Sequence, residues 1–102
     1  MKPLKLVEML PIQQGVGQNG EWKSQEFVVE TYERFPKKLC FQANGIHCDK
    51  LSGLAIGQFI FVSYDIECRK HNDRYFTSLI AWDIVPAEHP INYYQNGGQN
   101  KH

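Results

Sequence analysis

The sequence has no excess of charge of either sign. Eleven Lys and Arg residues balance eleven Asp and Glu residues, so the formal net charge at pH 7 is zero. This balance argues against a strongly basic nucleic-acid binder and against a polyacidic chain. No apolar run approaches the roughly 18 residues of a membrane-spanning helix. The segment before Pro11 also lacks an apolar stretch of signal-peptide length. We therefore expect a cytoplasmic protein with no membrane partner.

Cysteine is scarce, and its spacing indicates no disulfide framework and no thiolate zinc site. The three cysteines include no Cys-x-x-Cys pair. Cys40 and Cys68 lie in apolar runs, so both are predicted to be buried. Cys48 stands between His47 and Asp49, but adjacent residues rarely ligate one metal ion. No third group can be placed that would orient a histidine beside a Cys48 nucleophile.

The remaining enzyme signatures are absent or out of context. Residues 15–20 fit the pattern G-x-G-x-x-G, but a strand-like segment follows where a dinucleotide site needs a helix. No G-x-S-x-G, P-loop or H-E-x-x-H motif occurs. The sequence therefore predicts no catalytic, metal-binding or cofactor-binding residues, and we expect the protein not to be an enzyme.

Strand-like segments fill most of the 102 residues, which is the length of one domain. β-Branched and aromatic residues or period-two alternation mark five segments, at residues 4–14, 22–33, 38–43, 58–69 and 74–85. Turn-forming residues at 15–20 and 71–73 join the first pair and the last pair of these segments. A helix of one to two turns fits only within residues 44–54, at about 47–51.

This order of elements predicts an all-β fold, a five-stranded OB-fold. An OB-fold is a Greek-key barrel with a short helix between strands three and four, and it binds oligonucleotides or oligosaccharides. The barrel takes residues 1–85, and residues 86–102, rich in Asn, Gln, Gly and Pro, are expected to form a flexible, disordered tail. In the second strand, Phe27, Val29 and Thr31 are predicted to face inward, and Trp22, Val28 and Tyr32 outward.

The mixture of basic and aromatic residues near the turns predicts a single-stranded nucleic-acid site. Cations would track the phosphates while aromatic rings stack on bases. The candidate binding residues are Trp22, Lys23, Tyr32, Arg34, Lys37, Lys38, Arg69, Lys70, Arg74 and Tyr75. Asp65 and Glu67 share one strand face and are expected to form a solvated charge ladder with Arg69 and Arg74 rather than a catalytic pair.

Three stretches resemble a known family when they are taken together. They are WKSQEFVVET at 22–31, FPKKLCF at 35–41, and VSYDIECR at 62–69 running on to RYFTSLIAW at 74–82. They resemble a family of short bacterial proteins described only as a domain of unknown function and similar to single-stranded DNA-binding proteins. The resemblance covers about residues 4–85. It implies an OB-fold and a homo-oligomer, a dimer or a tetramer.

Two functions stay open on this evidence. The first is binding of single-stranded nucleic acid with little sequence preference, with DNA favoured over RNA. The alternative is a non-catalytic protein–protein assembly module that has the barrel but no nucleic-acid ligand. Burial of Trp22 and Tyr32 against a second subunit would favour assembly, whereas an open groove that joins them to Lys37 and Lys38 would favour nucleic acid.

Overall fold

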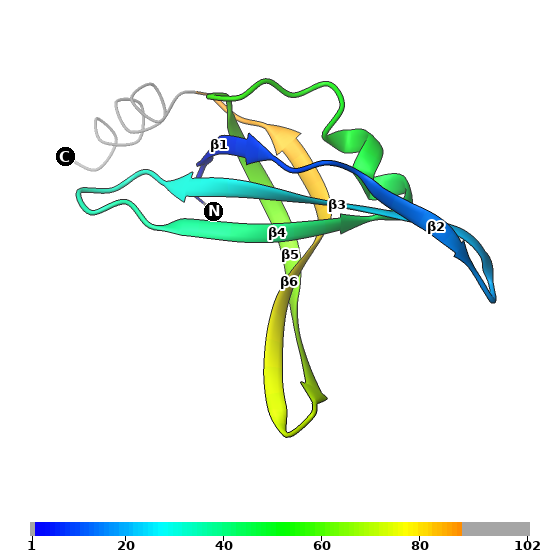
Figure 1. Ribbon diagram of the computed structural model, residues 1–102. Helices are drawn as coiled ribbons and strands as arrows, with labels where there is room; N and C mark the ends of the chain where they lie inside the picture. Colours follow the sequence, from blue (N-terminus) through cyan, green and yellow to red (C-terminus); the bar gives the residue numbers. More distant parts are fainter. Residues whose placement is uncertain (1, 89–102) are drawn as a thin grey trace.

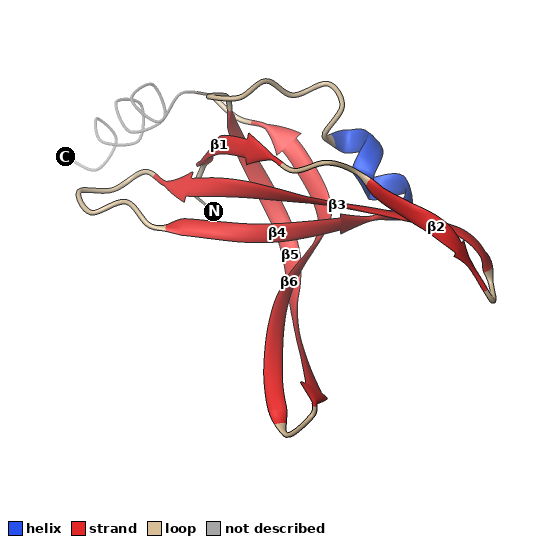
Figure 2. Ribbon diagram, viewed as in Figure 1, coloured by secondary structure: helices blue, strands red, loops and turns tan. Residues whose placement is uncertain are grey.

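The computed structural model describes residues 2–88 of the chain, and the predicted tail lies almost wholly outside them. Strands make up most of the described residues, and one short 3-10 helix lies against one end of the sheet (Figure 2). The elements are β1 (Leu4–Met9), β2 (Gln13–Gly17), β3 (Gly20–Thr31), β4 (Lys38–Asn44), η1 (Gly45–Lys50), β5 (Phe59–His71) and β6 (Arg74–Pro86). Within this part of the chain, no helix has the length and hydrophobicity to cross a membrane.

The strands close into a barrel in the order β1-β5-β6-β4-β3, with β1 also pairing to β3 (Figure 1). Every pairing is antiparallel except that of β4 with β6, which is parallel. A closed Greek-key barrel with η1 between its third and fourth strands is an OB-fold. The fold class predicted from the order of elements is therefore confirmed.

The first predicted strand is two strands, β1 and β2, which both pair with β3. The break falls at residues 10–12, where Pro11 has no N–H to give to the ladder. Leu10 restores contact with β3 by donating its N–H to the Glu26 carbonyl at 2.9 Å. The β2–β3 turn is also tighter than expected, because pairing continues to Gly17 opposite Gly20.

The core fills the barrel with side chains from every strand that closes it. Phe27 and Phe41 stack with their ring centroids 5.5 Å apart, and the Phe41 ring lies 5.0 Å from that of Tyr64. Phe27 and Val29 are fully buried, whereas Trp22 and Tyr32 are exposed, as predicted for β3. Thr31 and Val28, predicted inside and outside, are both half-buried. No polar or charged side chain of the described residues is buried.

The helix begins two residues earlier than expected and is a 3-10 helix that closes one end of the barrel. Its Cys48 side chain is buried and donates its S–H to the Ala43 carbonyl, with 3.2 Å between sulfur and oxygen. Leu51, just beyond the helix, is fully buried in the same core. One apolar face of η1 therefore anchors the connection between β4 and β5.

The β5–β6 hairpin projects from the barrel, which overturns the prediction that Cys68 is buried (Figure 1). In β5 the apolar parity is buried at Ile60 and Val62, but Ile66 on the same parity is 67% exposed. A register shift at Ser63 and Tyr64 marks the point where the strand leaves the core. Period-two alternation cannot show that a strand has run past the end of its barrel.

The prediction that Cys40 is buried was also wrong. Cys40 alternates with the buried Phe41 on β4, so it lies on the outer face of the sheet. An apolar run in the sequence does not show which of its residues point away from the core.

Candidate nucleic-acid interface

The ten predicted binding residues lie in three separate places on the barrel (Figure 1). Trp22 and Lys23 lie on the β2–β3 hairpin, and Tyr32 lies ten residues further along the chain, where β3 ends, about 30 Å away at strand spacing. With Tyr32 are three cations of the β3–β4 connection, namely Arg34, Lys37 and Lys38. The remaining four surround the tip of the β5–β6 hairpin, namely Arg69, Lys70, Arg74 and Tyr75. The cleft that Trp22 and Lys23 line includes none of the other eight.

The hairpin tip presents a cation and an aromatic ring on each of its two faces. The Lys70 ammonium lies 5.8 Å from the centroid of Tyr75, and the Arg74 guanidinium lies 5.8 Å from that of Phe76. Tyr75 and Phe76 are neighbours on β6, so their side chains point to opposite faces. The tight turn that supports them is formed by Asn72 and Asp73, both with positive φ angles, 51° and 63°. Both rings are exposed, Tyr75 at 69% and Phe76 at 49%.

The β3–β4 connection carries a similar pair. The Arg34 guanidinium lies 5.4 Å from the centroid of the Phe35 ring, which is 73% exposed. Thr31 at the end of β3 holds the loop, because its hydroxyl accepts a hydrogen bond from the Lys37 N–H at 2.8 Å. The Thr31 hydroxyl donates in turn to the Glu33 carboxylate at 2.8 Å. A fixed loop therefore displays an aromatic ring among three cations.

Phe35 and Phe76 are aromatic residues of these sites that sequence reasoning missed. Phe35 was available from its position between Arg34 and Pro36 in a loop, where a ring has no strand face to bury it. Phe76 belongs to a strand whose two parities are both apolar, a pattern typical of a strand covered on both faces. Its exposure follows only from the projection of the hairpin.

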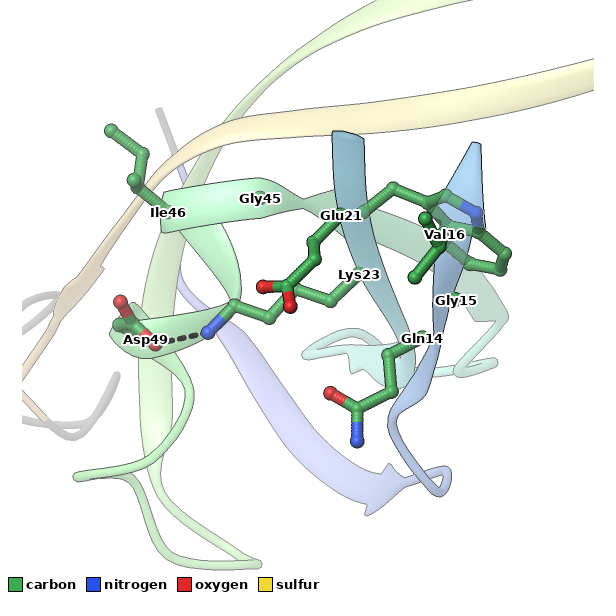
Figure 3. Close-up of a pocket in the computed structure, with 9 residues that line it drawn as sticks. Gln14, Gly15, Val16, Glu21, Lys23, Gly45, Ile46 and Asp49 are labelled. Carbon is green, nitrogen blue, oxygen red and sulfur yellow. Dashed lines mark hydrogen bonds and ion pairs between the residues drawn. The ribbon is translucent and has the colours of Figure 1, made fainter. Parts of the chain in front are cut away.

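A cleft of about 660 Å³ lies between the β2–β3 hairpin and η1 (Figure 3). Trp22 is one of the residues that line it. Its indole lies against the backbone of β2, and a Cβ at Gly15 would come within 2.9 Å of the ring. The absence of a side chain at Gly15 therefore sets the position of the indole, which stays 50% exposed. Exposed apolar side chains of Val16 and Ile46 line the same cleft.

Lys23 in this cleft is held by an ion pair. Its ammonium lies 2.8 Å from Asp49 of η1, and Figure 3 shows Lys23 and Glu21 extending from β3 toward that residue. The hydrogen bond to Asp49 and the negative charge of that carboxylate raise the pKa of Lys23. The prediction that Lys23 serves a phosphate therefore meets a competing carboxylate.

The outer face of β3 and its two neighbouring strands, on which OB-folds commonly hold nucleic acid, carries both acids and lysines, because Lys5 and Lys38 both lie opposite Glu30. Glu26 and Glu30 alternate with buried residues of β3, and Glu8 lies opposite Val28 on β1. The Cys40 thiol lies 3.7 Å from a Glu26 oxygen. Partial burial, with the charges of Glu26 and Glu8, raises the pKa of Cys40. The part of the face around Cys40 is therefore acidic, which disfavours a phosphate at that point.

The expected charge ladder on the hairpin is only partly present. Glu67 pairs with Arg69 along the same strand at 3.7 Å, but Arg74 lies opposite His71, not opposite either acid. Asp65 faces Ile80 across the hairpin. The part of the ladder that involved Arg74 was therefore wrong, because the turn brings Arg74 only to the end of β5.

The Cys48 thiol lacks the properties of a nucleophile. It is 3% exposed, and burial raises its pKa. A catalytic cysteine needs an accessible thiolate and a lowered pKa. No cluster of three metal-ligating side chains occurs within residues 2–88.

Residues 4–85 of the sequence match a known protein family. The chain belongs to the family described as Domain of unknown function (DUF3127). This confirms the resemblance seen in the sequence. No curated protein matches this DUF3127 chain.

Solved structures match this DUF3127 barrel. A single-stranded DNA-binding (SSB) domain from Synechococcus sp. is 17% identical, with a TM-score of 0.59, and the match covers 81% of this chain and 88% of that one. A small single-stranded DNA-binding protein from Streptomyces coelicolor is 15% identical, with a TM-score of 0.42, covering 82% of this chain and 89% of the other. The first likeness supports the OB-fold.

Proposed function

We propose that this protein binds single-stranded nucleic acid, DNA in preference to RNA, without catalysis and with little sequence preference. The observation that carries the proposal is the set of exposed cation–aromatic pairs on the β5–β6 hairpin and the β3–β4 connection. Stacking on bases and attraction to phosphates is the combination that single strands require. The protein with an SSB domain that shares this fold supports the choice of ligand.

The hairpin tip is the principal contact in this proposal. Lys70 and Arg74 attract phosphates, while Tyr75 and Phe76 offer rings on opposite faces. Aromatic stacking contributes about 1–3 kcal/mol per base and tolerates any sequence, because every base has a flat face. The β3–β4 connection is the second contact, with Phe35 beside Arg34.

The path of the strand follows the loops rather than the middle of the sheet. Glu8 and Glu26 around Cys40 repel phosphates from the middle of the sheet, and the ion pair of Lys23 with Asp49 weakens the attraction of Lys23 for them. Trp22 in its cleft offers a third stacking position at the far end of the barrel. Tyr32 meets Phe59 edge-on with ring centroids 5.7 Å apart, so it contributes less than predicted.

The test compares two charge reversals at exposed lysines. Lys70→Glu places a negative charge at the hairpin tip, and Lys5→Glu places one on the outer face of β1 opposite Glu30. Binding of a fluorescent dT oligomer of about 20–30 nucleotides is followed by anisotropy. We expect Lys70→Glu to weaken binding at least tenfold and Lys5→Glu to change it less than threefold. Equal losses would refute binding at the hairpin tip.

The aromatic contribution is tested by Tyr75→Ala. Loss of one stacked base reduces affinity by about 1–3 kcal/mol, or roughly 5- to 150-fold. Tyr75→Phe keeps the ring and is the matched control, with affinity expected near that of the wild type. Unchanged affinity of Tyr75→Ala would remove stacking from the proposal.

Three acids on the outer face of β1 and β3 favour a second candidate, an assembly module without a nucleic-acid ligand. Glu8, Glu26 and Glu30 would suit a basic protein surface. Absence of binding to dT oligomers at low salt, by a protein whose circular dichroism shows the folded state, would favour this alternative.

A further inference from the structure

The outer part of the β5–β6 hairpin has no neighbouring strand within residues 2–88. On one side, β1 pairs with β5 only at Phe59 and Ile60. On the other side, β4 pairs with β6 only from Leu79 to Ala81. A two-stranded ribbon alone is marginally stable in water, and a free strand edge is a template for further pairing.

The charges of β5 are not matched across this hairpin. Two acids, Asp65 and Glu67, come first along the strand, and Arg69, Lys70 and His71 follow. Asp65 faces Ile80 and Glu67 faces Ser78 on β6. The Glu67 carboxylate reaches only Arg69 on its own strand, at 3.7 Å, and that arginine is 84% exposed.

This arrangement of charges is complementary to itself in one antiparallel register. Two copies of β5 paired about a twofold axis place each residue opposite one the same distance from the centre. If the twofold axis passes through Glu67 or Arg69, that residue faces its own copy and like charges meet. If the axis passes through Ile66, Asp65 faces Glu67, and like charges meet again. If the axis passes through Cys68, Glu67 of each copy faces Arg69 of the other, so two pairs of opposite charge form.

The backbone supports the same centre. A two-residue turn closes with a hydrogen-bonded pair, here His71 and Arg74. Alternation along an antiparallel ladder then directs the N–H and C=O groups of Lys70, Cys68 and Ile66 to the free edge. Cys68 therefore has its backbone donor and acceptor available to pair with its own copy.

We propose that two copies of this chain pair antiparallel along the free edge of β5, centred on Cys68. The product is a four-stranded sheet in the order β6-β5-β5-β6. Four strands remove the exposed edge of β5 and give the projecting hairpin the support that its own barrel does not supply. The interface uses the edge of β5, so both faces of the hairpin, with Tyr75 and Phe76, stay open.

The test is the mass of the protein in solution, measured by sedimentation equilibrium without nucleic acid. We expect a dimer for the wild type. Glu67→Arg sets two arginines together across the interface, and Arg69→Glu sets two glutamates together, so each variant alone should dissociate about tenfold or more readily. An equimolar mixture of the two variants restores both opposite-charge pairs, and the dimer should return.

The mixture distinguishes a direct contact between residues 67 and 69 across the interface from a general loss of stability in either variant. A variant that is merely destabilised cannot be rescued by a different destabilised variant. A wild-type monomer at several hundred micromolar would overturn the proposal, as would a dimer indifferent to Glu67→Arg, or a mixture no more dimeric than its components.

A second measurement needs no charge change. Cys68 and its copy would lie about 5.5 Å apart between Cα atoms, within the range that a disulfide spans. In a Cys40→Ser background, oxidised glutathione should accept two electrons and two protons from the paired thiols and leave a covalent dimer. Adding Cys68→Ser should abolish that dimer. If the Cys40→Ser protein is a dimer by mass but does not cross-link, the interface does not lie at Cys68.

Discussion

Gly15→Ala is expected to displace Trp22 from the backbone of β2. A Cβ at position 15 would lie 2.9 Å from Cζ2 and 3.0 Å from Cε2 of the indole. Carbon atoms pack at about 3.5–4.0 Å, so the ring must move by about 1 Å. Nothing else changes at this residue, because its φ is not in the left-handed region.

The size of the effect follows from the exposure of the indole. A tryptophan side chain offers up to about 250 Å² of surface, so a half-exposed one has about 100 Å² covered. At about 25 cal/mol per Å², burial of this surface stabilises the fold by about 2–3 kcal/mol. A gap of about 0.5–1 Å loses about a quarter to a half of the contact energy. We therefore expect the free energy of unfolding of Gly15→Ala to lie about 1 kcal/mol below that of Gly17→Ala, which lacks the close contact.

Gly17→Ala on the same strand is the control, because its Cβ would meet Trp22 at an ordinary 3.6 Å. Both changes carry the same gain from replacing a strand glycine, about 0.5–1 kcal/mol, which cancels in the comparison. Urea unfolding in a Trp82→Phe background reports Trp22 fluorescence alone. Equal stabilities, with unchanged emission from Trp22, would refute the packing of the indole on Gly15.

Three further predictions test the core, a thiol and an ion pair. Phe41→Ala removes a fully buried ring that contacts two other rings, so urea unfolding should show a loss of about 3–5 kcal/mol, and a loss below about 1 kcal/mol would contradict the packing. Burial and then the charge of Glu26 raise the pKa of the Cys40 thiol, so Glu26→Gln should lower that pKa. The pH dependence of thiol alkylation measures the change, in proteins with Glu26 and with Gln at that position that both carry Cys68→Ser. The hydrogen bond from Lys50 lowers the pKa of Asp83. The ion pair of these two residues therefore stabilises the fold at neutral pH, and this stabilisation is lost as the pH falls below the ordinary carboxyl pKa of about 4. Thermal melts should therefore separate wild type from Lys50→Ala at about pH 7 and not at about pH 2.5, and an equal separation at both pH values would contradict this.

The order of elements was predictable because each strand has a local signature. Alternation around Phe27 and Val29, and turn residues at Asn72 and Asp73, need no knowledge of distant contacts. The two-segment first strand was not predicted, although Pro11 stood at the break. Its alternation is loose on both sides, and a proline near a strand end does not by itself divide a strand.

The places where prediction failed depend on tertiary arrangement. Cys68 and Ile66 continue the apolar parity of β5 beyond the end of the barrel, and only the three-dimensional extent of the sheet shows that they are exposed. The candidate cations lie near the turns to which the sequence assigned them, but the separation of the ten candidates into three places depends on where the barrel closes. The cluster of Glu8 and Glu26 around Cys40 depends on the pairing of β1 with β3, which the sequence does not show.

The measurement that tests the proposed function most directly is the salt dependence of binding to a dT oligomer. Quenching of tryptophan fluorescence gives the association constant at several salt concentrations, with an oligomer of about 20–30 nucleotides. About 3–4 phosphate contacts per protomer predict a slope of roughly −2 to −3 in log K against log salt, at about −0.7 per phosphate. A folded protein that shows neither quenching nor a rise in the anisotropy of a labelled oligomer at the lowest salt concentration, or a slope near zero, would contradict the account.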